Sequence, residues 1–318
     1  MRQFAAFLFN RDVPVAIIQL AIMVLGCSAF QNILHGAALT FAEFFAGVKA
    51  YSGNMWKRGF RGVALDILID GIWHDILSPQ GFAFAILIAL CVTPGGMTLL
   101  APVCSSWVWI CCAKSLRSVA FPMGDEGREF VRLANIMVSR VVAILWILTK
   151  RGIWWLLEQP LTSLLVLHDR FQEFVKHNNV WRAFFYMGLF FEHSCDTSAK
   201  PSVLYSNKPI VGEVRQASLQ RAWPLSWGRS MCNTNGTAVT GNSDALKDSA
   251  AYPMKFGQLL ADLFVRHKHV LASDAIVESK KDANVVFVSD LLQDLSGTCC
   301  WHDAEIDSAL EWLCQRQT

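Results

Sequence analysis

From residue 39 onward, short apolar runs alternate with longer segments of helical periodicity. The apolar runs have the length of buried strands and cover residues 39–45, 62–65, 97–103, 152–157 and 183–190. The segments between them are expected to be helical over residues 47–58, 78–92, 126–149 and 162–176. Repeated strand–helix alternation predicts an α/β fold, with a Rossmann-like, mostly parallel sheet and helices on both faces.

The pattern changes after Glu192. Residues 193–250 are rich in Ser, Asn, Thr, Gly and Lys and are predicted to be loop, apart from a short extended run at Pro201–Ser206. Helical periodicity returns at Met254–His267 and near Ala304–Cys314. The chain is therefore expected to divide into an N-terminal apolar helix (1–37), a Rossmann-like domain (38–210) and a loop-rich, partly disordered C-terminal region with short helices (211–318).

The N-terminal segment is uncharged between residues 13 and 42, and its most apolar part is long enough for a membrane span of about 20 helical residues. Arg2 and Arg11 precede it, as they would in a signal anchor. A second uncharged window, residues 76–113, is broken by Pro94-Gly95-Gly96 and favours core elements. Two hypotheses follow for residues 13–32: a helix that spans or lies on a membrane, or a helix that packs across the sheet.

Composition narrows the remaining choices. Only 17% of the residues are charged, below the roughly 25% of an average domain, which fits a fully buried sheet or a membrane protein. The net charge of +2 gives no bulk attraction to nucleic acid, so DNA or RNA would have to bind a local patch. The ten cysteines form no Cys-x-x-Cys pair, which argues against zinc and favours reduced thiols in an intracellular, nuclear or cytoplasmic protein.

A glycine turn follows the first predicted strand and acidic residues follow the second, at positions suited to a nucleoside. The first strand ends at Gly47, where a glycine turn lets the backbone approach a ligand, and Asp66 follows the second strand. A carboxylate there can accept hydrogen bonds from both hydroxyls of a ribose. Asp75 is placed to meet an adenine amino group. A tight turn with a capping Asp at either position is the structural alternative.

Two further residues stand at predicted strand ends. Cys104 follows an apolar strand and Pro102, and the dipole of a following helix would favour its thiolate. Glu158 follows the strand at 152–157, and a buried Glu needs a partner. The structural alternatives are a buried, inert Cys and a helix-capping Glu.

Together these segments resemble the cytosine-carbon-5 DNA methyltransferases, and more specifically a poorly characterised algal (dinoflagellate-type) branch of such domains. The resemblance covers about residues 40–210. It is carried by Glu43-Phe44-Phe45-Ala46-Gly47, Asp75-Ile76-Leu77-Ser78-Pro79, Ala101-Pro102-Val103-Cys104-Ser105-Ser106-Trp107, Glu158-Gln159-Pro160, Lys200-Pro201 and Ser206-Asn207.

The resemblance implies a function and a set of site residues. Cys104 would add to carbon 6 of a flipped-out cytosine, and Glu158 would hold and protonate ring nitrogen 3. S-adenosylmethionine would be bound by Phe45, Gly47, Asp66, Asp75 and Pro102.

The sequence also departs from the family pattern. Lys49-Ala50 replaces a glycine pair, Val103 replaces a proline and Gln159 replaces an asparagine, and a Gln-x-Arg-x-Arg segment is missing. Three hypotheses therefore stand: a methyltransferase-like domain, active or inactive; a non-catalytic relic or interaction module of a mobile-element protein; and a single-pass membrane protein.

Overall fold

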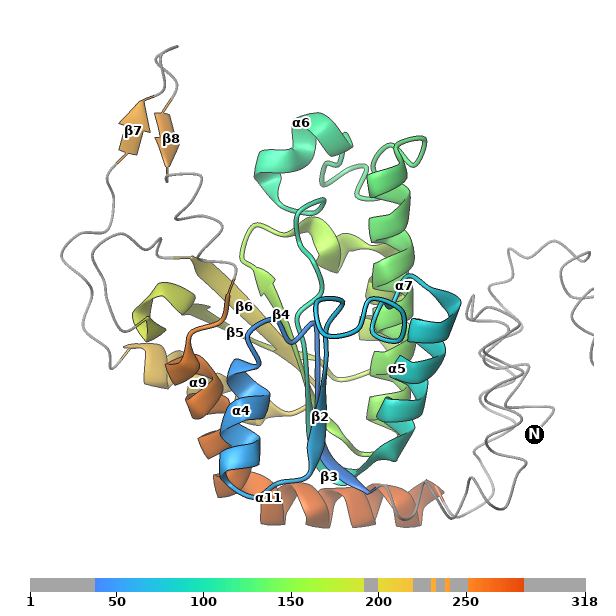
Figure 1. The fold of residues 1–318 in the computed structure, drawn as a ribbon, viewed down its shortest axis with the longest axis vertical. Coiled ribbons are helices and arrows are strands. Elements are labelled where there is room, and N and C mark those ends of the chain that lie inside the picture. The colour runs from blue at the N-terminus through green and yellow to red at the C-terminus, as the bar shows by residue number, and fades with distance from the viewer. Residues whose placement is uncertain (1–37, 192–199, 220–229, 233–237, 241–250, 283–318) are drawn as a thin grey trace, which may run out of the picture.

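The computed structural model describes residues 38–191, 200–219, 230–232, 238–240 and 251–282. The predicted N-terminal apolar helix, with its candidate membrane segment at residues 13–32, lies outside the described residues, as does the predicted helix near 304–314. Within them the chain forms a mixed α/β fold around one six-stranded sheet (Figure 1).

The sheet has the strand order β2-β1-β3-β4-β6-β5. Neighbours β2, β1, β3 and β4 pair in parallel, whereas β6 pairs antiparallel with both β4 and β5, so the sheet is mixed. The strands are β1 (Leu39–Phe44), β2 (Gly62–Leu65), β3 (Val92–Leu100), β4 (Trp154–Pro160), β5 (Trp181–Tyr186) and β6 (Pro201–Ser206). A separate antiparallel pair joins β7 (Ser230–Cys232) to β8 (Ala238–Thr240).

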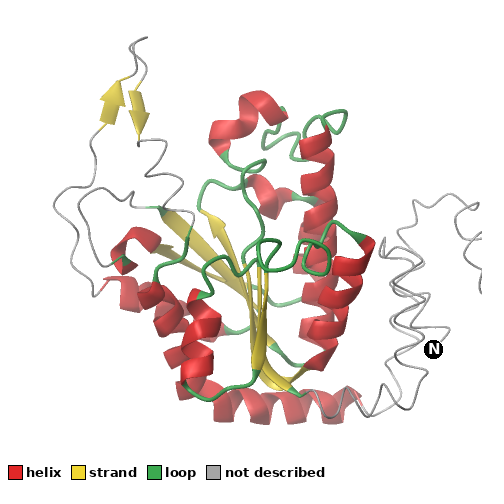
Figure 2. Cartoon of the chain, in the orientation of Figure 1, coloured by secondary structure: helices red, strands yellow, loops and turns green. Residues whose placement is uncertain are grey.

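Helices cover both faces of the sheet (Figure 2). One face is packed by α5 (Pro79–Cys91), α7 (Glu129–Lys150) and α8 (Asp169–His177), and the other by α4 (Ala50–Lys57), α9 (Gly212–Leu219) and α11 (Met254–Asp282). The short α6 (Cys112–Ser115) lies in the connection between β3 and α7. The two hydrophobic clusters thus lie on opposite sides of one sheet.

Alternation along the central strands decides which side chain enters which cluster. On β4, Trp155 and Leu157 enter the cluster under α5, α7 and α8, while Trp154 and Leu156 enter the cluster under α4 and α11. All four are fully buried. This explains the unbroken apolar run at this strand, because a strand covered on both faces has no solvent-facing positions.

Helix α7 is long and apolar enough to cross a membrane, and it is the only described helix of which this is true. Two thirds of its apolar window (67%) is nevertheless buried inside the fold. Its residues from Val141 to Leu148 supply much of the cluster that packs on α5 and β4. A core helix therefore accounts for this segment.

The extended run predicted at Pro201–Ser206 is β6, which pairs between β4 and β5. Two predicted elements differ from the structure. The helix expected over 162–176 is a 3-10 turn followed by α8, because His168 takes an extended conformation and caps α8 through its own ring. The strand expected over 183–190 ends at Tyr186 and continues as a 3-10 turn.

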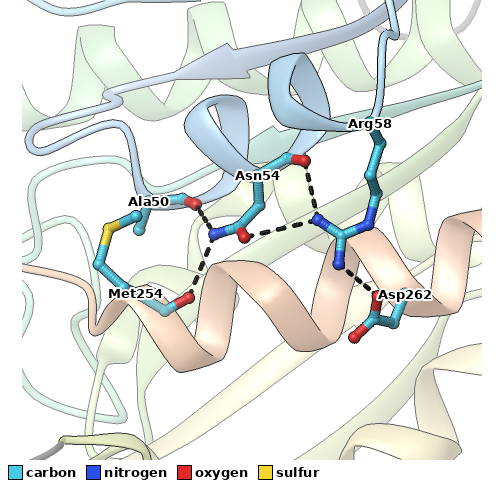
Figure 3. A network of polar contacts seen from close by, with 5 residues as sticks. All are labelled: Ala50, Asn54, Arg58, Met254 and Asp262. Atoms are coloured by element: carbon cyan, nitrogen blue, oxygen red, sulfur yellow. Dashed lines mark hydrogen bonds and ion pairs between the residues drawn. The ribbon is translucent and has the colours of Figure 1, made fainter.

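Helix α11 comes from the region that was predicted to hold only loops and short helices, yet it spans 29 residues and packs on α4. The Asn54 side chain joins the two helices by donating to the carbonyls of Ala50 and Met254, and Arg58 pairs with Asp262 (Figure 3). The helices come so close at Gly257 that a Cβ there would overlap the Ala50 carbonyl. This late segment therefore completes the second helical layer of the sheet, beside α4 and α9.

Candidate functional site

The parallel strands β1 to β4 all end at the same edge of the sheet, and the predicted site residues follow those ends. The chain passes from β1 to β2 on one side and then to β3 on the other side of β1, so the strand order reverses between β1 and β3. In open α/β sheets, ligands bind outside the carboxyl ends of the strands at such a reversal. This edge is the candidate site.

The turn after β1 is joined to the end of β2. The Gly47 amide donates to Asp66 Oδ2 (2.8 Å), and the Leu68 amide donates to Asp66 Oδ1 (2.9 Å). Phe45, Gly47 and Lys49 all have φ between 48° and 60°, a left-handed conformation that is unusual for residues other than glycine. The predicted juxtaposition of Gly47 and Asp66 is thus present, with each oxygen of the carboxylate already accepting one backbone hydrogen bond.

Glu43 is a buried carboxylate at the end of β1. Its side chain projects toward α4, where the amide (2.8 Å) and the hydroxyl of Ser52 donate to Oε2. Burial raises the pKa of Glu43 to about 7, against the Ser52 hydrogen bonds, which lower it. Its Oε1 is buried without a hydrogen-bond partner in the described part of the chain. An unpaired buried acceptor costs free energy, so a ligand that donates to Oε1 would be favoured.

Cys104 lies in the turn that follows β3. Burial raises the pKa of its thiol, and the charge of Glu158 raises it further, while Lys200 lowers it. The predicted effect of a helix dipole is wrong, because no helix begins at Cys104: the next helical turn, a 3-10 turn, starts at Trp109. The thiol is therefore protonated near neutral pH and needs a base to become nucleophilic. Cys91, Cys104, Cys111 and Cys112 are all free thiols.

Glu158 lies within β4, one position before Gln159, and is almost fully buried. Its Oε2 accepts a hydrogen bond from the Tyr252 hydroxyl (2.7 Å), and its Oε1 is buried without a partner among the described residues. Because Glu158 is buried inside the strand, it does not cap the helix that follows. The electrostatic interaction between Glu158 and the Cys104 thiol brings the two predicted catalytic residues into one group.

Tyr252, which precedes α11, links the members of this group. Burial raises the pKa of its phenol well above the ordinary value, and the charge and hydrogen bond of Glu158 add to that rise. Cys104 and Glu43 also interact with it electrostatically. The Lys200 ammonium lies 5.6 Å from the centroid of its ring. The site therefore contains a tyrosine from the C-terminal part of the chain.

The remaining predicted residues have structural partners. The Pro102 carbonyl accepts from Gln159 Nε2 (2.9 Å), which joins the ends of β3 and β4. Phe45 packs at the edge of the cluster under α5. Asp75 Oδ1 accepts from the Leu77 amide (2.9 Å) in the turn before α5, where its charge interacts with Arg140. The described contacts of Asp75 thus favour the structural alternative at that position.

No protein-family model matches this chain, and no curated protein matches its sequence.

The arrangement offers two kinds of chemistry. Carboxylate oxygens at Asp66, Glu43 and Glu158 can accept hydrogen bonds from a polar ligand, and Cys104 offers a nucleophile beside an acid. In the described ranges, His, Cys, Asp and Glu side chains form no group of three that could hold a metal ion. Neither Tyr252 nor Glu43 is among the predicted site residues, since Tyr252 lies at no strand end and Glu43 lies within a predicted strand. An acidic residue within an apolar strand was the available signal for Glu43.

Proposed function

We propose that this chain is an S-adenosylmethionine-dependent methyltransferase-like protein that uses Cys104 and Glu158 on a nucleobase. The observation that carries the proposal is the pairing at the sheet edge: Gly47 with Asp66 after β1 and β2, and Cys104 with Glu158 at β3 and β4. The resemblance assigns the first pair to the cofactor and the second to the cytosine. The two pairs lie on either side of the strand-order reversal.

The sheet supports a Rossmann-like description of its parallel half. Strands β2, β1, β3 and β4 are parallel, are linked by α4, α5 and α7, and have helices on both faces. This is the arrangement in which a nucleoside cofactor binds at the carboxyl edge, with an acidic residue at the end of the second strand. Asp66 occupies that position.

The residues at the turn fit the cofactor. A Cβ on Gly47 would meet no atom within 4 Å, so the space beside this turn is open. Each Asp66 oxygen accepts one backbone hydrogen bond and retains a second lone pair for a ribose hydroxyl. S-adenosylmethionine, when bound, would supply the methyl group.

Cys104 and Glu158 would then activate the base. Glu158 takes the proton of the Cys104 thiol and delivers it to ring nitrogen 3 while the thiolate forms a bond to carbon 6, which breaks the aromaticity and makes carbon 5 nucleophilic. After carbon 5 has taken the methyl group, carbon 5 loses its proton to water, ring nitrogen 3 returns its proton to Glu158, and the thiolate leaves, which restores the ring. Because burial and Glu158 raise the pKa of Cys104, the nucleophile must lose its proton as the substrate enters.

Calorimetry with S-adenosylmethionine tests the cofactor half of the proposal. We expect the full chain to bind, and Asp66→Ala to raise the Kd at least tenfold, since one hydrogen bond to a charged group is worth roughly 1.5–3 kcal/mol. Asp66→Asn retains an acceptor for the Gly47 amide, so its Kd should lie between those of the native chain and Asp66→Ala. Asp70→Asn is the matched control: Asp70 lies in the same loop and accepts only from the Ile72 and Trp73 amides. Its Kd should equal that of the native chain.

A 5-fluorocytosine oligonucleotide tests the catalytic half. Fluorine at carbon 5 replaces the hydrogen that must leave as a proton, so the thioether to Cys104 should persist and be found by peptide mapping. Cys104→Ser should abolish the adduct, and Cys112→Ser should not affect it. An adduct that forms on another cysteine, or equally well without S-adenosylmethionine and Glu158, would contradict the proposed chemistry.

An interaction module is the second candidate, favoured by the loop between β2 and α5. Five large apolar side chains in this loop are exposed, with Leu68 86% and Ile72 65% accessible, and the others are Ile67, Ile69 and Trp73. Apolar exposure of this kind marks binding surfaces. Lys49→Gly separates the two functions, because it removes the side chain that replaces a family glycine. If titration with S-adenosylmethionine gives no heat of binding for either the native chain or Lys49→Gly, the interaction module is the better description.

A further inference from the structure

Tyr252 reaches the candidate site from a part of the chain far from the four parallel strands. It lies 94 residues after Glu158, just before α11, and its hydroxyl donates to Glu158 Oε2 at 2.7 Å. Its ring is held independently of that bond, by an edge contact with Phe256 (centroids 5.5 Å apart) and by the Lys200 ammonium. The docking of α11 on α4 therefore fixes where the hydroxyl stands.

The two oxygens of Glu158 are in different situations. Oε2 is occupied by Tyr252, whereas Oε1 is buried and has no donor among the described residues. A carboxylate held at one oxygen cannot rotate away, so its other oxygen keeps a fixed direction. An unpaired, desolvated acceptor favours a ligand that brings an N–H group to it.

We propose that Tyr252 is a positioning residue: its hydroxyl fixes Glu158 so that Oε1 is presented, beside the Cys104 thiol, to a ring nitrogen of a planar nitrogen heterocycle and accepts the N–H once that nitrogen is protonated. This inference rests on the proposed function for the identity of the reaction, and it adds the C-terminal segment to the site. It also gives the α11 segment a functional role, because Tyr252, just before this helix, contacts Glu158.

A merely structural Tyr252 would have different consequences. A buried phenol needs a hydrogen-bond acceptor wherever it lies. If Tyr252 were only structural, loss of its hydroxyl would lower the stability of the fold by the same amount whether or not Glu158 is charged. A positioning residue acts through Glu158, so its effect must vanish when Glu158 loses its charge. Dependence on Glu158 is therefore the property to measure.

The first experiment needs no turnover. Alkylation of Cys104 by iodoacetamide is followed against pH in the full chain by peptide mapping, for the native chain, Tyr252→Phe, Glu158→Gln and the double variant. The ionisable groups that act on this thiol are Glu158, Lys200, Cys111 and Tyr252 itself. Without the tyrosine hydroxyl, the charge of Glu158 is no longer partly neutralised by that hydrogen bond and acts more strongly on the thiol, so we expect the alkylation midpoint of Tyr252→Phe to rise by about 0.5 pH unit or more.

In the Glu158→Gln background, the same Tyr252→Phe change should leave the midpoint where it was. Tyr205→Phe is the matched control, because Tyr205 lies on β6 and packs toward the opposite face of the sheet. An unchanged midpoint in Tyr252→Phe, or an equal shift with and without the Glu158 charge, would overturn the positioning role.

The second experiment uses the 5-fluorocytosine oligonucleotide with S-adenosylmethionine. Tyr252→Phe should slow adduct formation at Cys104 at least tenfold and leave the Kd for S-adenosylmethionine within twofold of the native value, since the Tyr252 hydroxyl bonds to Glu158 whereas the Gly47 amide bonds to Asp66. In the Glu158→Gln background, Tyr252→Phe should slow adduct formation by less than a further twofold. If the native chain forms no adduct, the proposed function fails, and the alkylation experiment still decides the role of Tyr252.

Discussion

Two adjacent residues of β4, Glu158 and Gln159, are both buried polar side chains, but they lie on opposite faces of the sheet and have opposite hydrogen-bonding situations. Gln159 is satisfied at both ends: its amide donates to the Pro102 carbonyl (2.9 Å), and its oxygen accepts from Ser163 (2.8 Å). Glu158 has one oxygen on Tyr252 and one with no partner among the described residues. Glu43, on the same face as Glu158, repeats that pattern.

The contrast separates structural polar groups from candidate functional ones. The Gln159 amide ties two strand ends together, and both of its polar atoms already have a protein hydrogen-bond partner. A buried carboxylate with an unpaired oxygen is costly in the folded protein, and such groups concentrate at sites where a ligand completes the hydrogen bonding. The face under α5, α7 and α8 is thus expected to carry stability, and the face under α4 and α11 to carry function.

The largest expected effect compares neighbours on the two faces. Leu157→Ala should lower the free energy of unfolding by about 2–5 kcal/mol, because Leu157 is fully buried in the cluster under α7 and its loss leaves a cavity. Glu158→Gln should change it by less than about 1 kcal/mol, since removal of a buried charge offsets any weakened hydrogen bond. Urea unfolding measures the free energy of unfolding of both variants. If Glu158→Gln lowered it as much as Leu157→Ala, the two faces of the sheet would not differ as proposed.

The next effect concerns Glu43 and pH. Its pKa is about 7 in the folded chain and near 4.5 when unfolded, so the folded state holds the proton more tightly. The stability that this group contributes is complete below pH 4.5 and is lost as pH rises through 7, by about 3 kcal/mol in total. Glu43→Gln cannot titrate and should flatten this part of the stability–pH curve. Parallel curves for the two proteins between pH 5 and 8 would contradict the assignment.

The smallest effect tests Gln159. Ser163→Ala removes the donor to its oxygen and should cost about 1 kcal/mol of stability, because one buried acceptor is left unpaired. Binding of S-adenosylmethionine and alkylation of Cys104 should stay at native values. A change in either would show that the satisfied face also contributes to the site.

Much of the fold follows from local pattern. Strands β1, β2 and β4 and helices α4, α5 and α7 lie close to their predicted ranges, because apolar runs and helical periodicity are local signals and α5 has a capping serine, Ser78, with a proline after it. Strand β3, predicted from residue 97, begins at Val92, because the chain stays extended through Pro94-Gly95-Gly96 with a register shift against β1. The pairing of Gly47 with Asp66 also agrees with prediction, since parallel strands end at one edge. The roles assigned to Asp66, Cys104 and Glu158 stay predictions, and Asp75 has structural partners instead.

By itself, the sequence determined the alternation of elements, the two-sided burial of β4 and the placing of polar residues at strand ends, since each depends on neighbours in the chain. Only the tertiary structure decided that β6 enters the sheet beside β4, that α11 closes its second face, and that Tyr252 meets Glu158. These contacts join residues up to about two hundred positions apart, such as Asn54 and Met254. No local pattern encodes them, because their free energy arises only when distant surfaces fit together.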